Sequence, residues 1–321
     1  MMALLRSAVR SRYTPFFYLM RLLVLMICIF FVHRFCHRAT GGFTLLKIQS
    51  HHAYNPKWDT PSLTELEKEA LTPILNQKFS FFSYGGQAYV FLSEDKTTVL
   101  KVFKQHHLRM PNWLKNLPLP KPLKKFRNKL VHRKEETLNL FFDSCLIANN
   151  RFKDQTGLLY VHLNPTCGLN QQLTLIDKLG IAHQIDLDRA DFILQKRARL
   201  APRHFLHLKK NNDIAGAKES IDSLLDLMVT RCKKGIADRD PNLRRNCGFI
   251  GNRAVEIDIG SYSDNPVLKL PFAWRTDLYY KTLQLKRMVN KRFPELSDYL
   301  SQRIEELLTL PQEDQEMPAT A

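Results

Sequence analysis

Apolar residues form one long run near the start of the chain and shorter, patterned groups afterwards. Residues 22–32 read LLVLMICIFFV, and extension back to Phe16 gives 17 positions that only Arg21 interrupts. This length is at the lower end of what crosses the hydrocarbon core of a bilayer, and an arginine near the end can reach the headgroups. A cleaved signal peptide is the alternative, but the run is followed by the bulky, basic residues 33–38. The pattern predicts an uncleaved transmembrane helix within residues 1–40.

The orientation of this helix does not follow from the flanking charges, because three basic residues stand on each side. They are Arg6, Arg10 and Arg12 before the run and Arg34, Arg38 and Lys47 after it. Residues 41–76 are predicted to form a juxtamembrane linker. It ends in a short helix within SLTELEKEALTPIL, which Ser62 or Thr64 could cap.

From residue 77 the pattern changes to short alternating segments. KFSFFSYGGQAYVFLSEDKTTVLKVFK reads as three strands joined by turns, and TGLLYVHLNPT, IAHQIDL and ADFILQKRA read as further strands. A helix is expected at about 133–149, and the segment AKESIDSLLDLMVTRCKKG predicts a buried helix. Further helical segments are predicted after residue 270. We therefore predict an α+β chain with a small sheet-rich N-lobe at 77–198, a helical C-lobe at 199–310 and a flexible tail at 311–321.

The composition excludes several classes of protein. Of 321 residues, 44% are apolar and 25% are charged, which argues against a disordered chain and against a multi-span membrane protein. The six cysteines are scattered without a C-x-x-C pair, so neither a zinc ribbon nor a disulfide scaffold is expected. The net charge of +17 is the unusual figure. A nucleic acid, an anionic membrane or an anionic substrate could each account for it.

Two segments of the sheet-rich region contain residues that could bind a ligand. Gly85 and Gly86 occupy a turn between strands, where backbone N–H groups can approach phosphate oxygens because glycine has no side chain. Lys101 lies in the apolar strand VLKVF, and by alternation it shares a face with Val99 and Phe103. A lysine on a buried face needs an anionic partner. Each feature alone is more often structural than functional.

Two further segments follow the predicted buried helix. Asp238-Arg239-Asp240 precedes Asn246, and Asp258 lies in the segment VEIDIG. Carboxylate and amide oxygens can hold Mg²⁺ against a polyphosphate, while another aspartate orients a substrate hydroxyl.

In this order, and with these elements between them, the four segments resemble those of the protein-kinase-like superfamily over roughly residues 78–300. The pattern G-x-G-x-x-G-x-V corresponds to Ser83, Gly85, Ala88 and Val90, so only the middle glycine is kept. The lysine of V-A-I-K corresponds to Lys101, H-R-D-L-x-x-x-N to Asp238-Arg239-Asp240 and Asn246, and D-F-G to Asp258-Ile259-Gly260.

The resemblance implies a two-lobed fold with ATP and Mg²⁺ between the lobes. Lys101 would hold the α- and β-phosphates, Asp240 would be the catalytic aspartate, and Asn246 and Asp258 would be the metal ligands. The nucleotide would also contact Gly85, Gly86, Ala88 and Val90. Glu136, in preference to Glu135, would be the acidic partner of Lys101.

The sequence departs from the family pattern in ways that leave alternatives open. Asp238 replaces the histidine, and the spacing from Asp240 to Asn246 is one residue longer than usual. Either the loop bulges or Asp238 is the catalytic carboxylate. No A-P-E motif follows Asp258 before the next predicted helix, a feature shared with small-molecule and lipid-like kinases of the superfamily. The resemblance therefore implies a membrane-anchored phosphotransferase acting on a hydroxyl of a lipid-linked, glycan or protein substrate. A catalytically inactive pseudokinase, serving as a membrane-tethered binding module, is the alternative.

The positive charge is concentrated in two places. Six arginines flank or interrupt the apolar run, and residues 101–134 contain 11 Lys and Arg but no Asp or Glu, whereas the remainder is close to neutral. No nucleic-acid-binding signature accompanies the charge, so no nucleic acid is expected as a partner. We read residues 104–132 as a basic, proline-rich insertion, a solvated loop or a surface that faces anionic lipid. ATP dependence would place the kinase-like domain in the cytoplasm, as part of a single-pass membrane protein.

Overall fold

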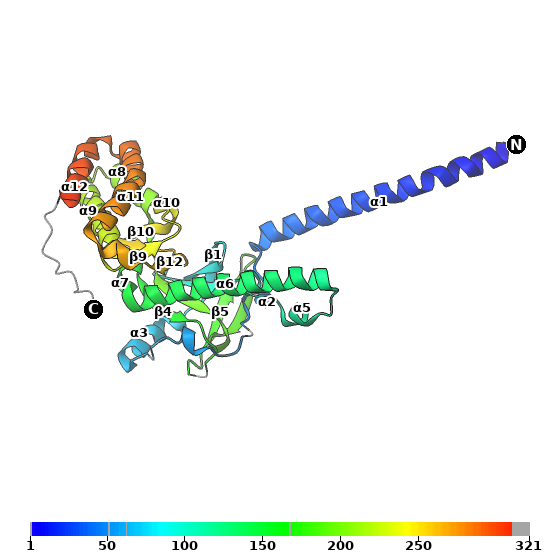
Figure 1. The fold of residues 1–321 in the computed structure, drawn as a ribbon, viewed down its shortest axis with the longest axis horizontal. Helices are drawn as coiled ribbons and strands as arrows, with labels where there is room; N and C mark the ends of the chain where they lie inside the picture. The colour runs from blue at the N-terminus through cyan, green and yellow to red at the C-terminus, as the bar shows by residue number, and fades with distance from the viewer. Residues whose placement is uncertain (1, 51, 62, 167, 310–321) are drawn as a thin grey trace.

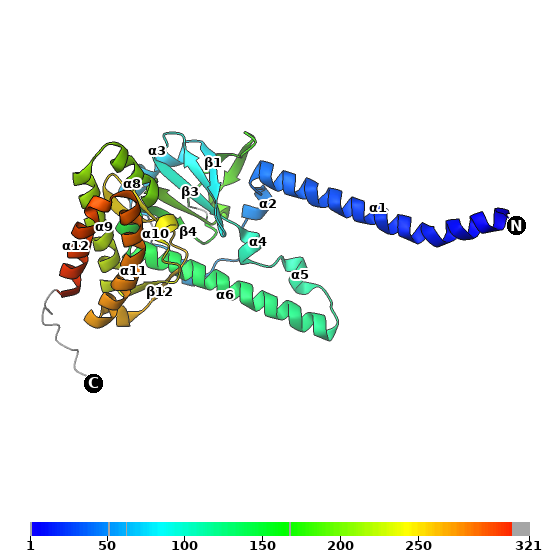
Figure 2. The same ribbon diagram turned by 90° about the horizontal axis from the view of Figure 1, so that it is seen from above.

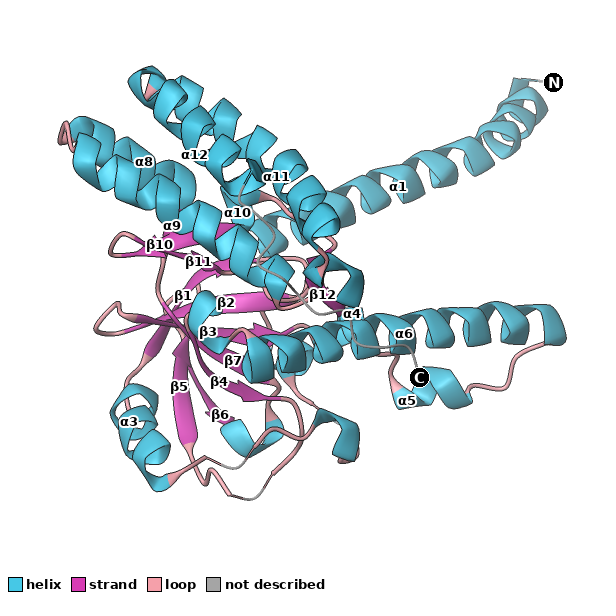
Figure 3. Cartoon of the chain, turned by 60° about the vertical axis from the view of Figure 1, so that its left-hand side comes forward, coloured by secondary structure: helices cyan, strands magenta, loops and turns pink. Residues whose placement is uncertain are grey.

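The computed structural model describes residues 2–50, 52–61, 63–166 and 168–309. A long N-terminal helix extends from a body that consists of a curved sheet and a helical C-terminal part (Figure 1). Helices α8, α9, α11 and α12 gather on one side of the molecule, away from the large sheet (Figure 3). This arrangement confirms the predicted two-lobed α+β fold class. The predicted tail, residues 311–321, and the alternative helix cap Ser62 lie outside the described residues.

Helix α1 spans Met2–Thr40. Its segment Phe16–Thr40 is long and apolar enough to cross a membrane, and none of its most apolar stretch is buried against the body. The C-terminal end of α1 is attached to the sheet, because Lys178 Nζ donates to the carbonyl oxygen of Arg38 at 2.8 Å and the Tyr89 hydroxyl donates to that of Gly42. The helix thus emerges from the body at a defined point.

The segment after α1, predicted as a juxtamembrane linker, is held against the sheet. Ser50 Oγ and His52 Nε2 contact the buried carboxylate of Asp191 at 3.1 and 3.0 Å, and Gln105 Nε2 donates to it at 2.7 Å. Thr64 caps α3 in a capping box with Glu67. The elements here are α2 (Leu45–Ile48), η1 (Pro56–Trp58) and α3 (Glu65–Leu75).

A seven-stranded sheet forms the N-lobe, in the order β4-β7-β3-β2-β1-β5-β6. Only the β1–β5 pair is parallel. The hairpin β5–β6 extends the β1 edge, and β5 is a strand that the sequence analysis did not identify. The strands are β1 (Phe79–Tyr84), β2 (Ala88–Ser93), β3 (Thr98–Phe103), β4 (Leu158–His162), β5 (Gln172–Ile176), β6 (Ala182–Asp186) and β7 (Phe192–Lys196), with η2 at Leu187–Arg189.

The basic insertion is helical, which differs from the predicted solvated loop. Helix α6 spans Lys121–Arg151 and begins 12 residues before the expected start at 133. Pro122 lies in its first turn, where a missing backbone N–H costs nothing. The buried side chains of α6 begin at Leu138, so its N-terminal half extends beyond the body (Figure 2). Helices α4 (Gln105–Leu108) and α5 (Asn112–Asn116) precede it, and α7 (Lys153–Thr156) follows.

The C-lobe surrounds the buried helix α9 (Ile214–Lys233), as its apolar stripe predicts. Two small sheets face the N-lobe, β11-β10-β8 and β12-β9. Their strands are β8 (Arg199–Leu200), β9 (Ile236–Asp238), β10 (Cys247–Ile250), β11 (Arg253–Glu256) and β12 (Tyr262–Asp264). The remaining elements are α8 (Ala201–Lys210), α10 (Leu243–Asn246), η3 (Pro266–Lys269), α11 (Pro271–Arg292), η4 (Pro294–Leu296) and α12 (Ser297–Thr309).

Candidate active site

A cleft of about 1150 Å³ lies between the two lobes. It is bounded by the β1–β2 turn, strand β3, the connection from β7 to β8, and the loop that follows β11. Seven of the residues that the sequence analysis selected line this cleft: Gly85, Gly86, Ala88, Val90, Lys101, Asp240 and Asp258. Asp238, Asn246 and Glu136 are not in its lining.

Lys101 projects from β3 into the cleft, on the same face as Val99 and Phe103. Its ammonium group donates a hydrogen bond to the carbonyl oxygen of Ile257 in the other lobe. Burial lowers the pKa of Lys101, and the charge of Asp258 partly opposes this effect. The site thus holds a desolvated cation that a negatively charged ligand would stabilise.

The structure does not bring Glu136 or Glu135 to Lys101. Glu136 is paired with His132 at 3.2 Å and Glu135 with Lys115 at 3.1 Å. Both glutamates lie on the half of α6 that extends beyond the body, whereas Phe141 and Cys145 are the residues of α6 that lie near Lys101. Within the described part of the chain, no carboxylate forms an ion pair with Lys101 at 4 Å or less.

The loop between β9 and β10 accommodates its extra residue as the short helix α10. Asn242 Oδ1 caps this helix by accepting from the backbone N–H of Arg245 at 3.2 Å. Asn246 Nδ2 donates to the backbone carbonyl of Asp240 at 2.7 Å, which fixes the amide plane. The side chain of Asp240 remains exposed at the cleft. Asn246 is mostly buried behind it.

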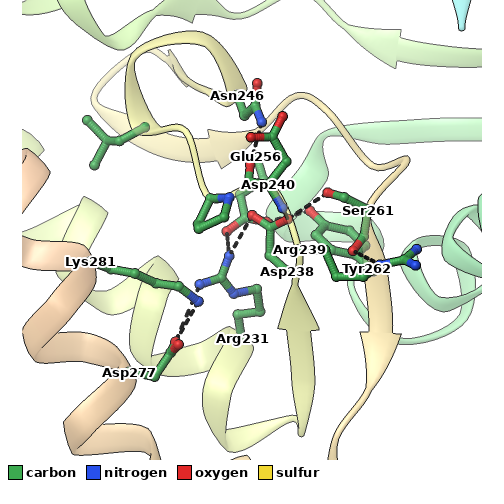
Figure 4. Close-up of polar contacts among 12 residues, drawn as sticks. Arg231, Asp238, Arg239, Asp240, Asn246, Glu256, Ser261, Tyr262, Asp277 and Lys281 are labelled. Atoms are coloured by element: carbon green, nitrogen blue, oxygen red, sulfur yellow. Dashed lines mark hydrogen bonds and ion pairs between the residues drawn. The ribbon is translucent and has the colours of Figure 1, made fainter. Parts of the chain in front are cut away.

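Asp238, in contrast, is part of a buried polar network (Figure 4). Its Oδ1 accepts from Ser261 Oγ at 2.6 Å and from the backbone N–H of Asp240 at 3.0 Å. Its Oδ2 lies 3.3 Å from a guanidinium nitrogen of Arg231. Every one of these contacts holds Asp238 in place, and the hydrogen bond to Asp240 orients the loop.

Arg231 and Glu256 form the centre of this network, and sequence reasoning missed both. Their side chains meet at 2.7 Å with almost no solvent exposure, and Tyr262 donates to the other oxygen of Glu256 at 2.5 Å. Burial raises the pKa of Glu256, while the charge of Arg231 opposes that rise. The sequence does contain a signal for this pair, because Arg231 lies in the apolar segment LMVTRCK and Glu256 in the apolar segment RAVEI.

The segment Asp258-Ile259-Gly260 passes directly under the β1–β2 turn. The backbone N–H of Gly260 donates to Asp258 Oδ1 at 3.3 Å. A Cβ at position 260 would lie 2.7 Å from the Phe141 ring and 2.8 Å from Gln87 Oε1, so any larger residue would force the ring or the backbone to shift. This close packing sets the position of the Asp258 carboxylate at the cleft.

The glycine turn is open on its cleft side and is held from behind. No atom lies within 4 Å of the Cβ positions of Gly85 and Gly86. Lys104 Nζ donates to the carbonyl oxygen of Gly85 at 2.7 Å, and His107 Nδ1 to that of Gly86 at 2.8 Å. These two hydrogen bonds to the Gly85 and Gly86 carbonyl groups fix the turn. Lys104 directly follows β3, and it was not predicted from the sequence as a site residue.

The donor set suits Mg²⁺ only in combination with a phosphate ligand. Among the described residues, no group of three or more His, Cys, Asp or Glu side chains could hold a metal ion without help. Asp258 offers a carboxylate and Asn246 an amide oxygen, and Mg²⁺ is commonly bound by one or two protein oxygens plus substrate phosphates. Asp258 at the cleft therefore suits the ion as a nucleotide complex, whereas Asn246 is not in the cleft lining.

No family model matches the chain, and no curated protein sequence matches it significantly. Solved structures with a similar fold include WbdD, described as a bifunctional kinase-methyltransferase, at 16% identity and a TM-score of 0.32 over 74% of this chain. The chain spans about half the length of WbdD, 48%. The Rv3197–erythromycin complex from Mycobacterium tuberculosis matches at 13% identity and a TM-score of 0.31, over 81% of this chain and 75% of that one. The streptomycin–ATP–APH(2")-IIa complex matches at 12% and 0.26, over 78% and 94%. These likenesses concern the fold only and carry no conclusion about what this chain binds or does.

Proposed function

We propose that this chain is a membrane-anchored, kinase-like phosphotransferase. It moves the γ-phosphate of ATP to a hydroxyl of a lipid-linked, glycan or protein acceptor, and its kinase-like body lies on the cytoplasmic side of the membrane. The observation that carries the proposal is the convergence of Lys101, Asp240 and Asp258, far apart in the sequence, on one interlobe cleft below a fixed glycine turn.

In the proposed reaction the chain positions its substrates and stabilises charge. Lys101 binds the α- and β-phosphates, and the backbone of the Gly85-Gly86 turn covers them. Asp240 accepts a hydrogen bond from the acceptor hydroxyl and takes its proton as the phosphoryl group transfers. Mg²⁺, held by Asp258 and Asn246, would neutralise the phosphate charge. Asp238 acts through Asp240, because it holds the backbone of the loop.

Nucleotide binding and hydrolysis test this proposal. The full chain in lipid nanodiscs is titrated with MgATP by calorimetry, and release of phosphate is measured without an added acceptor. We expect binding that requires Mg²⁺ and that is lost in Lys101→Ala and Asp258→Ala, with Asp240→Ala losing hydrolysis but not binding. Lys68→Ala, at a surface lysine paired with Glu65, is the control. Absence of Mg²⁺-dependent binding in the parent would overturn the proposal.

A pseudokinase is the second candidate, and one observation favours it. Within the described residues Lys101 has no carboxylate partner on α6, where the family pattern has a glutamate. This function predicts that MgATP binds without turnover and that Asp240→Ala changes nothing in either measurement. Hydrolysis that disappears in Asp240→Ala would exclude it.

A further inference from the structure

We propose that residues 111–134, which comprise α5 and the N-terminal half of α6, form a second membrane contact. This segment, called here the α5–α6 projection, reaches an anionic bilayer surface with its outer end, where its apolar side chains enter the headgroup region. The inference does not depend on catalysis. It shares with the proposed function only the insertion of α1 into a membrane.

The first argument is the exposure of large apolar side chains. Trp113, Leu123 and Phe126 are 68%, 54% and 63% exposed, and Leu117 between them is 39% exposed. None of the residues of α5 is buried. Large apolar side chains gathered in one projecting segment indicate an interaction surface, because isolated exposure of this kind is common but clustering is not.

The projection is nevertheless a defined structure. Arg127 donates to the carbonyl oxygen of Leu117 at 2.6 Å, and Lys115 is paired with Glu135 at 3.1 Å. Lys134 Nζ donates to the carbonyl oxygen of His106 at 2.6 Å, which ties the base of the projection to the segment after β3. The apolar side chains are therefore displayed by a folded hairpin.

The second argument is charge. Residues 101–134 contain no Asp or Glu. Within the part of the chain that the structure describes, no ion pair neutralises Lys121, Lys124, Lys125 or Lys129. Each basic residue near an anionic leaflet strengthens binding to it. Several lysines without ion-pair partners beside aromatic side chains are typical of protein segments that contact a membrane interface.

The third argument is position. Figures 1 and 2 both show that α1 and the N-terminal half of α6 extend from the body toward the same side of the molecule. A bilayer that surrounds α1 therefore approaches the projection and not the helical C-lobe. This continuity with the candidate span favours a lipid surface over an acidic soluble protein, which would not require the two elements to share a direction.

Tryptophan quenching tests the contact directly. The full chain is reconstituted into vesicles of phosphatidylcholine or of phosphatidylcholine with phosphatidylglycerol at about 7:3, containing lipids brominated near the headgroup end of their acyl chains. The chain has three tryptophans, and Trp58 and Trp274 are buried. The difference between the parent and Trp113→Phe therefore reports on position 113. We expect Trp113 emission to be quenched at least twofold more in the anionic vesicles.

A triple variant separates the role of charge from that of α1. Lys121→Gln/Lys124→Gln/Lys125→Gln should abolish the anionic-lipid-dependent quenching of Trp113, while the chain stays membrane-embedded after alkaline extraction. The matched control replaces three exposed lysines of the C-lobe, Lys210, Lys233 and Lys291, by Gln and should retain the quenching. Unquenched Trp113 in anionic vesicles overturns the proposal. Equal quenching in neutral and anionic vesicles overturns the anionic specificity.

Discussion

The ammonium group of Lys101 donates a hydrogen bond across the cleft to the backbone carbonyl of Ile257, the residue before Asp258. One lysine thus links the sheet-rich lobe to the segment that presents the candidate metal ligand. Without an acidic partner on α6, Lys101 is stabilised mainly by this carbonyl and by the more distant charge of Asp258. A bound polyphosphate would supply the anionic contact that the protein does not.

Lys101→Met should separate ligand binding from stability. Burial lowers the pKa of Lys101, so its charge costs more in desolvation than its neighbours return. We expect the free energy of unfolding to stay the same or to rise by about 0.5–2 kcal/mol, and the thermal stabilisation by MgATP to disappear. Urea unfolding and thermal melts with and without MgATP measure both. A variant less stable than the parent that still responds to MgATP would contradict this interpretation.

Asp240→Asn and Asp238→Asn should have opposite consequences. Asp240 is exposed at the cleft, so its variant should keep the parent stability and lose about 10²–10⁴-fold in ATP hydrolysis. Asp238 accepts buried hydrogen bonds from Ser261 and from the loop backbone, so Asp238→Asn should lower the free energy of unfolding by about 1–3 kcal/mol. Equal destabilisation of the two variants would show that their roles are not divided in this way.

Arg231→Leu should be among the most destabilising substitutions in the C-lobe. It leaves the buried carboxylates of Glu256 and Asp238 without their shared cation, at a cost of about 3–5 kcal/mol in the free energy of unfolding. Arg303→Leu, at the partly exposed pair with Asp222, is the matched control and should cost about 1 kcal/mol or less. Adding Glu256→Gln to Arg231→Leu should recover part of the loss in urea unfolding. If stability is not recovered, the unpaired Glu256 carboxylate is not the cause of the destabilisation in Arg231→Leu.

Gly260→Ala should displace the Asp258 segment. The added methyl group would overlap the Phe141 ring, which is fixed in the core, so relief requires a backbone shift that costs about 1–3 kcal/mol of stability. We also expect weaker MgATP binding in calorimetry. Gly168→Ala, where the Cβ would meet no atom within 4 Å, is the control and should match the parent. Unchanged stability in Gly260→Ala would show that the segment can move freely.

His204 should make stability depend on pH. Its ring stacks on Phe249 and contacts Ser220 Oγ at 2.9 Å, and burial lowers its pKa to about 4. In the unfolded chain the pKa is near 6.5, so between about pH 6.5 and pH 4 only the unfolded state binds the proton. Stability contributed by His204 is therefore present above pH 6.5 and declines as the pH falls through this window.

The measurement compares urea unfolding at pH 7.5 and pH 5.0. The parent should lose about 2 kcal/mol more than His204→Gln between these values. His132→Gln, on the exposed part of α6, should behave like the parent. If His204→Gln and the parent lose the same amount, another group is responsible.

The sequence predicted the local placement of the site residues better than it predicted which distant residues they contact. Alternation in VLKVF correctly put Lys101 on one face with Val99 and Phe103, because a strand has a period of two wherever it lies. The helix at 214–233 followed from its apolar stripe in the same way. Both inferences depend only on residues close together in the sequence.

What the sequence could not specify depends on long-range packing. The choice of Glu136 required the rotation and start of α6, and these are set by the burial of Leu138, Phe141 and Cys145 against the body. The prolines suggested a loop, although three of them precede Lys121 and Pro122 occupies a first turn that tolerates it. The Arg231–Glu256 pair joins a helix to a strand 25 positions later, a contact that no local pattern encodes.

The buried carboxylate of Asp191 has a mechanical consequence. It binds the segment that leaves α1, through Ser50 and His52, and the segment that leads to the projection, through Gln105. The body cannot swing on a flexible tether, so with α1 in a bilayer the mouth of the cleft stays at one height above the lipid. Under the proposed function, this fixed distance would limit which acceptors can be reached, by how far each hydroxyl stands out from the membrane as well as by its chemistry.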